Sequence, residues 1–598
     1  MSLELIFTAA KSTGTHADVL TAAGLADLLA SAVGASSVRL VEEGPRFRVE
    51  LAQPADLVED LVPAPGYPYL QVKTDGTPVQ VHDVVSYPAE RQRVDVYNQT
   101  RKAIREKKAS ESDPDVAQLL QLNQPRPDWR LLQVLNALQG FNNTNHVHGL
   151  IVSSKPEDLR LQLVEALANF QAGKPSGLGW DVSSVQLFNP NAAKGYGALK
   201  PRGTDRNDRT KEQWTDSLVE WLRYRGYFAC ACPFFTGSKG EHIRVLCPVP
   251  ADISLAGLRH VSAELRAAPI YGNAPKVDAL AVLHMARILI ERSQFGDQPS
   301  SAISMLGINL LGKTPARIIS GLAITNYQSL GQARAVSDLS LLAVPDWFEI
   351  HSQQDAADWL GILDEQQRII GSLRDERSDE VGLLIRYRRF LEQRGGRAAD
   401  AFIDFMGAYG SFLVPARDRD RRRRLPSFST QHAHRVIGGL MAEYVDILDA
   451  PGFQAVARAI RRSTVSAQAL KAIGARDYRE IRYDLLPEIR RKRALPKPES
   501  LIEALADFVV SYNSENARRR EMKKLAPGNV TTDEFQELVG LIEQRGAPLV
   551  GALLAAYGSC REPRDSEGPA EDAPGDVQDD AGDLAGPSSP DDVEDGEE

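Results

Sequence analysis

Lysine and arginine gather in five short segments of the sequence, and phosphate binding is the chemistry that such cations supply. The first segment is a polar, Gly-rich loop over residues 189–208, and the other four lie in the C-terminal half. We predict that these cations contact nucleic acid: Lys194, Lys200, Arg202, Arg206, Arg421, Arg422, Arg423, Arg424, Arg461, Arg462, Arg490, Arg491, Lys492, Arg493, Arg518, Arg519 and Arg520. The alternative is that the arginines lie on solvated helix surfaces without binding anything.

The charge distribution favours a nucleic-acid partner for the C-terminal half. The chain has 598 residues and a net charge of −10, but the last 38 residues hold 15 acidic and 2 basic side chains. Residues 381–530 contain 29 Lys and Arg against 17 Asp and Glu, so an acidic total hides a basic region. Binding of such a region to phosphates is stabilised by counterion release.

Motifs for catalysis or metal binding are absent from the sequence. Cys230 and Cys232 are separated by one residue, whereas zinc sites need two to four. His146 and His148 would share a face if they lay on a strand, but no further ligand is near in sequence to complete a metal site. The residues 9–12 lack the glycine spacing of a P-loop. We therefore expect a binding or scaffold protein rather than an enzyme, with no metal and no cofactor.

A tryptophan-rich helix is expected to support the basic loop. Thr210 and Gln213 have capping-box spacing for its start, and Gly226 is expected to end it. One face of this helix is apolar at i, i+4, i+7 and i+8. That face carries Trp214, Leu218, Trp221 and Leu222. Strands are expected over residues 227–235 and 242–249.

The chain as a whole predicts an α+β protein: an N-terminal mixed α/β body, then a basic C-terminal helical bundle and a disordered acidic tail. The expected regions are 1–125 (mixed α/β), 126–352 (α/β with the basic loop), 353–555 (helical) and 561–598 (tail). In the body we expect helices over 16–33, 90–108, 129–138, 156–171 and 277–292, a hairpin over 37–51, and strands over 3–8, 146–153 and within 318–347. Ser154 and Glu157 have the spacing of a second capping box.

Location follows from what the sequence lacks. We find no signal peptide and no stretch apolar enough to span a bilayer, and four cysteines are too few for a disulfide framework. A reducing cytoplasm and no membrane partner are therefore expected.

Two stretches carry a resemblance to a known family. The loop Asn189-Pro-Asn-Ala-Ala-Lys-Gly195 with Lys200 and the helix after it resembles the middle of large subunits of type I CRISPR Cascade complexes. The stretch 384–409, with Tyr387-Arg-Arg-Phe390 and Phe402-Ile-Asp-Phe405-Met, resembles the start of their C-terminal helical region. The layout of an α/β body before a basic bundle is also similar, and the resemblance covers roughly residues 1–550.

The resemblance implies a non-catalytic subunit of an RNA-guided antiviral surveillance complex. Its partners would be guide CRISPR RNA, target DNA, the backbone and foot subunits of Cascade and a helicase-nuclease effector. It would help to recognise a short motif beside the target, stabilise the displaced strand and recruit that effector, while guide pairing reads most of the sequence. Two alternatives stay open: a metal-dependent nuclease whose acidic residues converge only in the fold, and a regulatory protein that binds no nucleic acid.

Overall fold

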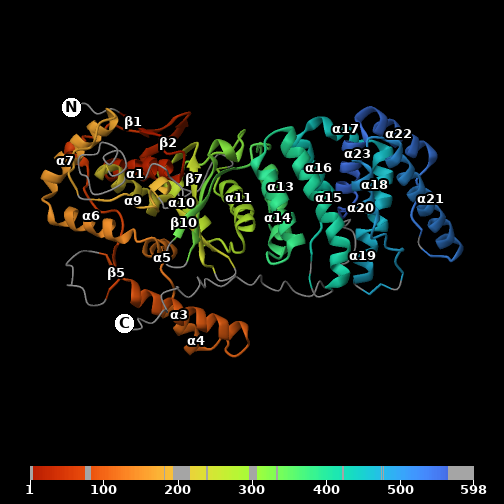
Figure 1. Cartoon of the computed structure of the whole chain (residues 1–598), viewed down its shortest axis with the longest axis horizontal. Helices are drawn as coiled ribbons and strands as arrows, with labels where there is room; N and C mark the ends of the chain where they lie inside the picture. The colour runs from red at the N-terminus through yellow and green to blue at the C-terminus, as the bar shows by residue number, and fades with distance from the viewer. Residues whose placement is uncertain are drawn as a thin grey trace.

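The computed structural model describes residues 5–562 except for 74–82, 181, 193–215, 238–239, 295–305, 331–333, 421–422, 424, 473, 476 and 525. The described chain is an N-terminal α/β region followed by a helical C-terminal region, as the sequence predicts (Figure 1). The acidic tail, apart from Arg561 and Glu562, lies outside the described residues.

The N-terminal hairpin forms at the expected place because its apolar residues alternate. Strand β2 (Val38–Glu43) buries Val38 and Leu40, and strand β3 (Arg46–Leu51) buries Phe47, Val49 and Leu51. These five side chains lie on one face of the hairpin. The outer strands β1 (Ile6–Ala10) and β8 (Asp252–Ser254) complete an antiparallel sheet of order β1-β3-β2-β8.

Two glycines let the central helices of the body cross closely. Helix α1 (His16–Val33) packs on α9 (Ser217–Cys230), and a Cβ on Gly24 would lie 1.7 Å from the Leu222 carbonyl oxygen. A Cβ on Gly226 would lie 1.9 Å from the Leu20 carbonyl oxygen. The expectation that Gly226 ends its helix is therefore wrong: Gly226 is needed for close backbone approach, and the helix continues to Cys230.

A second antiparallel sheet has the order β10-β9-β7-β6. Its strands are β6 (Cys232–Thr236), β7 (His242–Pro250), β9 (Ile319–Ser329) and β10 (Arg334–Ala343). The expected strand 227–235 begins only at Cys232, because residues 227–230 still belong to α9. Helices α10 (Leu255–Ala267) and α11 (Ala274–Glu291) pack beside this sheet.

The expected strand over 146–153 is wrong, because these residues form the end of helix α6 (Phe141–Ser153). Its buried residues are Thr144, Val147, His148 and Ile151, which lie at i, i+3, i+4 and i+7. Helices α5 (Trp129–Ala137) and α7 (Pro156–Gln171) flank it as expected, but α7 has no side-chain N-cap, so the predicted capping box of Ser154 is also wrong.

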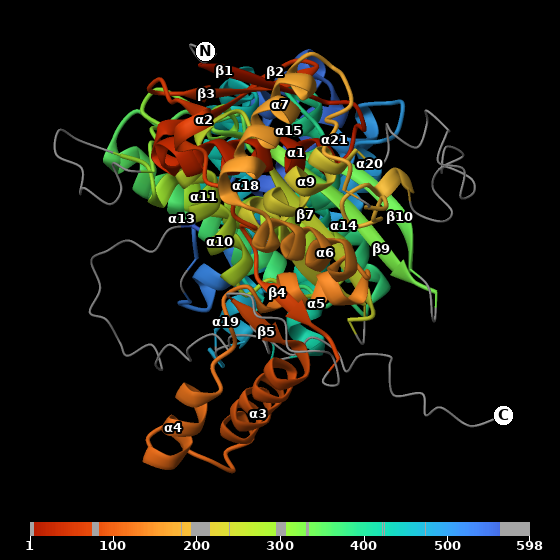
Figure 2. The ribbon, with the colours of Figure 1, turned by 90° about the vertical axis from the view of Figure 1, so that its left-hand side faces the viewer.

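A helical hairpin projects from the body. After the short helix α2 (Leu57–Asp60) and the parallel strands β4 (Tyr69–Gln71) and β5 (Val84–Ser86), helices α3 (Tyr87–Arg105) and α4 (Pro114–Leu122) extend away from the remaining elements. Both views show this projection (Figures 1 and 2).

The helical region begins with α13 (Gln353–Ser372), at the predicted boundary. The two apolar stripes predicted for α14 (Ser378–Glu392) and α15 (Gly396–Arg419) are buried, including Tyr387 and Phe402. The described helices that follow are α16 (Thr430–Leu440), α17 (Val445–Asp449), α18 (Pro451–Ser463), α19 (Val465–Ala472), α20 (Leu485–Lys492), α21 (Glu499–Glu521), α22 (Thr532–Arg545) and α23 (Ala547–Tyr557). Helix α23 is mostly buried and contacts α15, α20 and α22.

A buried ion-pair network joins the two regions. Asp278 of α11 is fully buried and accepts hydrogen bonds from Arg244 of β7 at 2.7 Å and from Arg388 of α14 at 2.7 Å. Asp338 of β10 lies 3.1 Å from the Arg244 guanidinium. Because breaking a buried pair leaves an uncompensated charge, this network fixes the helical region against the body.

Contrary to expectation, one described helix is long and apolar enough to cross a membrane by length and composition. This helix is α1, which has 18 residues and is 83% buried inside the protein. The two sheets and α9 that pack on it account for its apolar composition.

Candidate nucleic-acid interface

The predicted basic loop lies outside the described residues, so Lys194, Lys200, Arg202 and Arg206 remain predictions. Its flanks are described. On one side the Asn191 side-chain amide donates to the Thr13 carbonyl at 3.1 Å, and on the other Asp216 caps α9 by accepting from the Val219 amide at 3.1 Å. The predicted helix start at Thr210 and Gln213 also lies outside the described residues.

Of the predicted apolar face, Leu218, Trp221 and Leu222 are buried in α9, and Trp214 lies outside the described residues; α9 is buried on its other sides as well. Trp221 of α9 is fully buried, its ring lies edge-on to Trp180 with centroids 5.7 Å apart, and the Arg225 guanidinium lies 5.2 Å from its centroid. The chain that leads into and out of the basic loop is therefore held on a rigid part of the body.

Three of the predicted nucleic-acid contacts instead stabilise the fold. Arg423 donates to Glu380 of α14 at 2.7 Å, and the Glu380 side chain is fully buried. Arg461 is 3% exposed and pairs with Glu562 at 2.6 Å. Arg519 pairs with Asp477 at 2.8 Å. Their neighbours Arg421, Arg422 and Arg424 lie outside the described residues.

The remaining predicted cations reach solvent to different degrees. Arg491, Arg518 and Arg520 are exposed, whereas Arg462 and Lys492 are half-buried. Arg520 donates to the Pro527 carbonyl at 3.3 Å and to Asn529 at 3.1 Å, and Arg491 lies 4.0 Å from Glu488. Pro527 and Asn529 carry no charge and the Arg491–Glu488 pair is exposed, so these contacts leave most of the positive charge at the surface.

Two predicted cations converge on one carboxylate. Arg490 of α20 and Arg493, which follows its last residue, lie 3.3 Å and 3.5 Å from the Asp404 carboxylate of α15. The sequence interpretation missed two members: Asp404 itself, and Arg386 of α14, which also pairs with it. We call these four residues the Asp404 cluster.

The Asp404 cluster has an excess of positive charge at the protein surface. One carboxylate faces three guanidinium groups, and the four side chains are between 23% and 43% exposed. Burial lowers the pKa of Arg490, and the positive charges of Arg386 and Arg493 lower it further, against the opposing effect of Asp404. Within the described residues Asp404 is the one carboxylate that pairs with these three arginines, so the cations outnumber their acidic partner. A phosphate could bind there, because Arg groups match phosphate oxygens bidentately.

The histidines and cysteines singled out in the sequence are described. In the part of the chain that the structure describes, no group of three or more His, Cys, Asp or Glu side chains could hold a metal ion. His148 is buried and His146 is exposed on helix α6, so the two do not share a face. Cys230 and Cys232 are buried, and burial raises the pKa of the Cys232 thiol to about 12.

Comparison of the sequence with models of protein families finds no match, and comparison with curated proteins finds none either.

Proposed function

We propose that this chain is the non-catalytic large subunit of a CRISPR RNA-guided antiviral surveillance complex. In this proposal it helps to recognise the target-adjacent motif, stabilises the displaced DNA strand and recruits the helicase-nuclease. Guide RNA, target DNA and the backbone and foot subunits are its partners. The Asp404 cluster is the observation that carries the nucleic-acid part of this proposal, and the resemblance described above carries the assignment to a surveillance complex.

The geometry of the Asp404 cluster suits a strand whose sequence is not read. Arg490 and Arg493 are three residues apart at the end of α20, so they lie on one face, and Arg386 reaches the same carboxylate from α14. Guanidinium groups that contact phosphates hold a strand in place without discriminating among bases. A displaced strand needs this kind of contact, because base pairing with the guide has already selected the target.

The proposal is tested by purifying the tagged chain from its native host and sequencing the RNA that accompanies it. We expect discrete repeat-spacer RNAs and a small set of co-purifying subunits. A chain that purifies without guide RNA would contradict the surveillance-complex assignment. Cleavage of DNA by the isolated chain with Mg²⁺ or Mn²⁺ would instead favour the nuclease alternative.

A further inference from the structure

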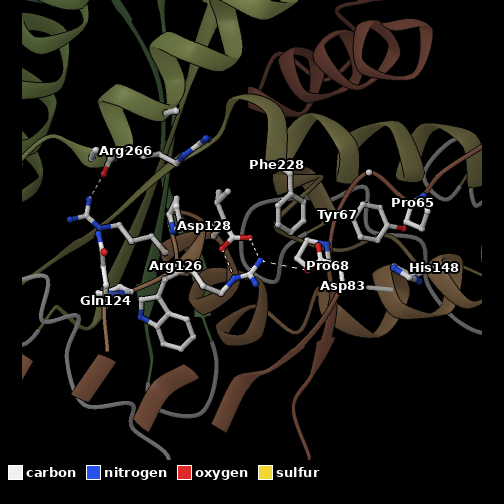
Figure 3. A pocket seen from close by; sticks show the side chains of 18 of the residues that line it. Pro65, Tyr67, Pro68, Asp83, Gln124, Arg126, Asp128, His148, Phe228 and Arg266 are labelled. Carbon is white, nitrogen blue, oxygen red and sulfur yellow. Dashed lines mark hydrogen bonds and ion pairs between the residues drawn. The ribbon is translucent and has the colours of Figure 1, made fainter. Parts of the chain in front are cut away.

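A cleft of about 790 Å³ opens in the α/β body (Figure 3), and its lining contains no residue of the Asp404 cluster. Its walls come from the segment before β4, the loop that leads into α5, helix α6 and the ends of α9 and α10. The volume lies within the range of small-ligand sites in proteins. The lining residues used below are Tyr67, Arg126, Trp129, Arg130, Phe228 and Arg266.

One part of the wall is aromatic. Tyr67 and Phe228 are stacked with ring centroids 5.8 Å apart and planes 21° apart, and Figure 3 shows both rings at the cleft. Trp129 is stacked on Tyr87 at 5.2 Å. Phe228 is only half-buried, so a planar group could extend this stack.

Three arginines line another part of the wall, and they differ in their partners. Arg126 is neutralised by Asp128, with hydrogen bonds of 2.9 and 3.0 Å, and lies 3.8 Å from Asp83, which also lines the cleft. Arg130 donates to the Arg266 carbonyl at 2.9 Å, and Arg266 donates to the Ala231 carbonyl at 2.9 Å. Within the described residues neither of these two guanidinium groups pairs with a carboxylate. A partly buried cation without a counter-ion is costly, and an anion in the cleft would offset that cost.

We propose that this cleft binds a nucleotide, with its base against Tyr67 and Phe228 and its phosphate beside Arg130 and Arg266. The chemistry is shared by a free mononucleotide and by an unstacked nucleotide within a single strand. The inference does not depend on the proposed function, because a free nucleotide is sufficient to occupy the cleft.

The test is calorimetric titration of the full chain with each of the four nucleoside monophosphates, with the matching nucleosides and with inorganic phosphate. We expect at least one mononucleotide to bind at least tenfold more tightly than its nucleoside and than phosphate. Equal binding of phosphate would reduce the site to an anion site, and absence of mononucleotide binding would overturn the proposal outright.

Variants separate the two halves of the site. Arg266→Gln should weaken mononucleotide binding at least tenfold and leave nucleoside binding unchanged, whereas Phe228→Leu, which keeps an apolar side chain, should weaken both. Arg39→Gln, on the N-terminal sheet, is the matched charge control and should leave mononucleotide affinity unchanged. Each variant is compared at the same fraction folded, measured by urea unfolding. If both cleft variants fold and bind as the wild type does, the cleft is not the site.

A trinucleotide distinguishes the two sources of the nucleotide. If the trinucleotide binds at least tenfold more tightly than the mononucleotide, and Phe228→Leu abolishes this binding, the cleft holds a base within a strand. Equal or weaker binding would assign it to a free nucleotide. These experiments use the isolated chain and small ligands, so their outcome is independent of the purification test. Nucleotide binding can be absent while guide RNA co-purifies with the protein, and it can be present while guide RNA does not.

Discussion

Removing the three arginines of the Asp404 cluster should weaken strand binding through charge alone. In the variant Arg386→Gln, Arg490→Gln, Arg493→Gln, up to three phosphate contacts are lost. For single strands each contact contributes about 0.7 to the slope of log K against log salt, so the slope should become shallower by about 2. If the variant and the wild type bind equally at 1 M salt, the variant should bind about a hundredfold more weakly than the wild type at 0.1 M salt.

Fluorescence anisotropy of a labelled single-stranded oligonucleotide, titrated at several salt concentrations, measures this slope directly. The matched control carries three arginines of the N-terminal sheet, changed to Gln: Arg39, Arg46 and Arg48. This sheet lies at the other end of the molecule from α20, and its arginines are paired with carboxylates (Figure 1). The control removes the same charge and should leave the slope within about 0.5 of the wild type.

The opposite change at Asp404 makes the test sharper. Asp404→Asn removes the carboxylate that competes with phosphate, so strand affinity should rise, by about fivefold for one charge at 4 Å in water. The same substitution should lower the free energy of unfolding slightly, by about 1 kcal/mol, because the cluster is exposed. An unchanged slope in the triple variant, an equal effect of the sheet control, or weaker binding by Asp404→Asn would refute this reasoning.

Three further predictions concern the fold. Arg423→Ala should lower the free energy of unfolding, measured in urea, by about 3 kcal/mol, because Glu380 is left buried and unpaired. The salt slope of binding should not change. A stable variant with a shallower slope would show instead that Arg423 contacts the strand. Gly226→Ala should destabilise the protein by about 3 kcal/mol or more, since the new Cβ meets the Leu20 carbonyl, and an unchanged urea midpoint would contradict the close crossing. The pKa of His16 is lowered to about 4 by burial, so His16 is neutral when folded; stability should fall by up to about 3 kcal/mol between pH 6.5 and pH 4, and His16→Gln should remove this part of the pH dependence.

The sequence predicts elements well where apolar residues alone set the period. The bounds of α1 and α7, the hairpin of β2 and β3, and the start of the helical region at α13 agree with the structure. In each, most buried residues are Val, Leu, Ile, Ala or Phe, so the apolar pattern is visible without knowledge of the partners, even though α1 and α13 also bury polar side chains.

Helix α6 shows why this reasoning fails when polar residues are buried. Its inward face includes Thr144 and His148, and a count of apolar residues sees only the short run after them, which looks like a strand. Including the two polar residues restores the spacing of i, i+3, i+4 and i+7. Gly226 fails for another reason: a glycine that permits a helix crossing cannot be told in sequence from one that ends a helix.

The candidate site was predicted in residue type but only in part in position. Arg490 and Arg493 are half-buried and pair with Asp404, whereas Arg423 pairs with a glutamate 43 residues earlier in the chain. Asp404, the carboxylate with which the three arginines of the cluster pair, lies 86 residues before Arg490. Such distant partners decide whether an arginine stabilises the fold or is available to a ligand, and local sequence patterns do not contain them.

Site-specific photocrosslinking tests most directly whether the Asp404 cluster lies against a strand. A benzophenone amino acid at Leu495, exposed and two residues beyond Arg493, would be irradiated in the complex purified from the native host with bound target DNA. The matched control carries the same group at Val62, an exposed position in the α/β body. We expect crosslinks to DNA from position 495 and none from position 62. Crosslinks from neither position, or from position 62 alone, would contradict the proposed strand contact.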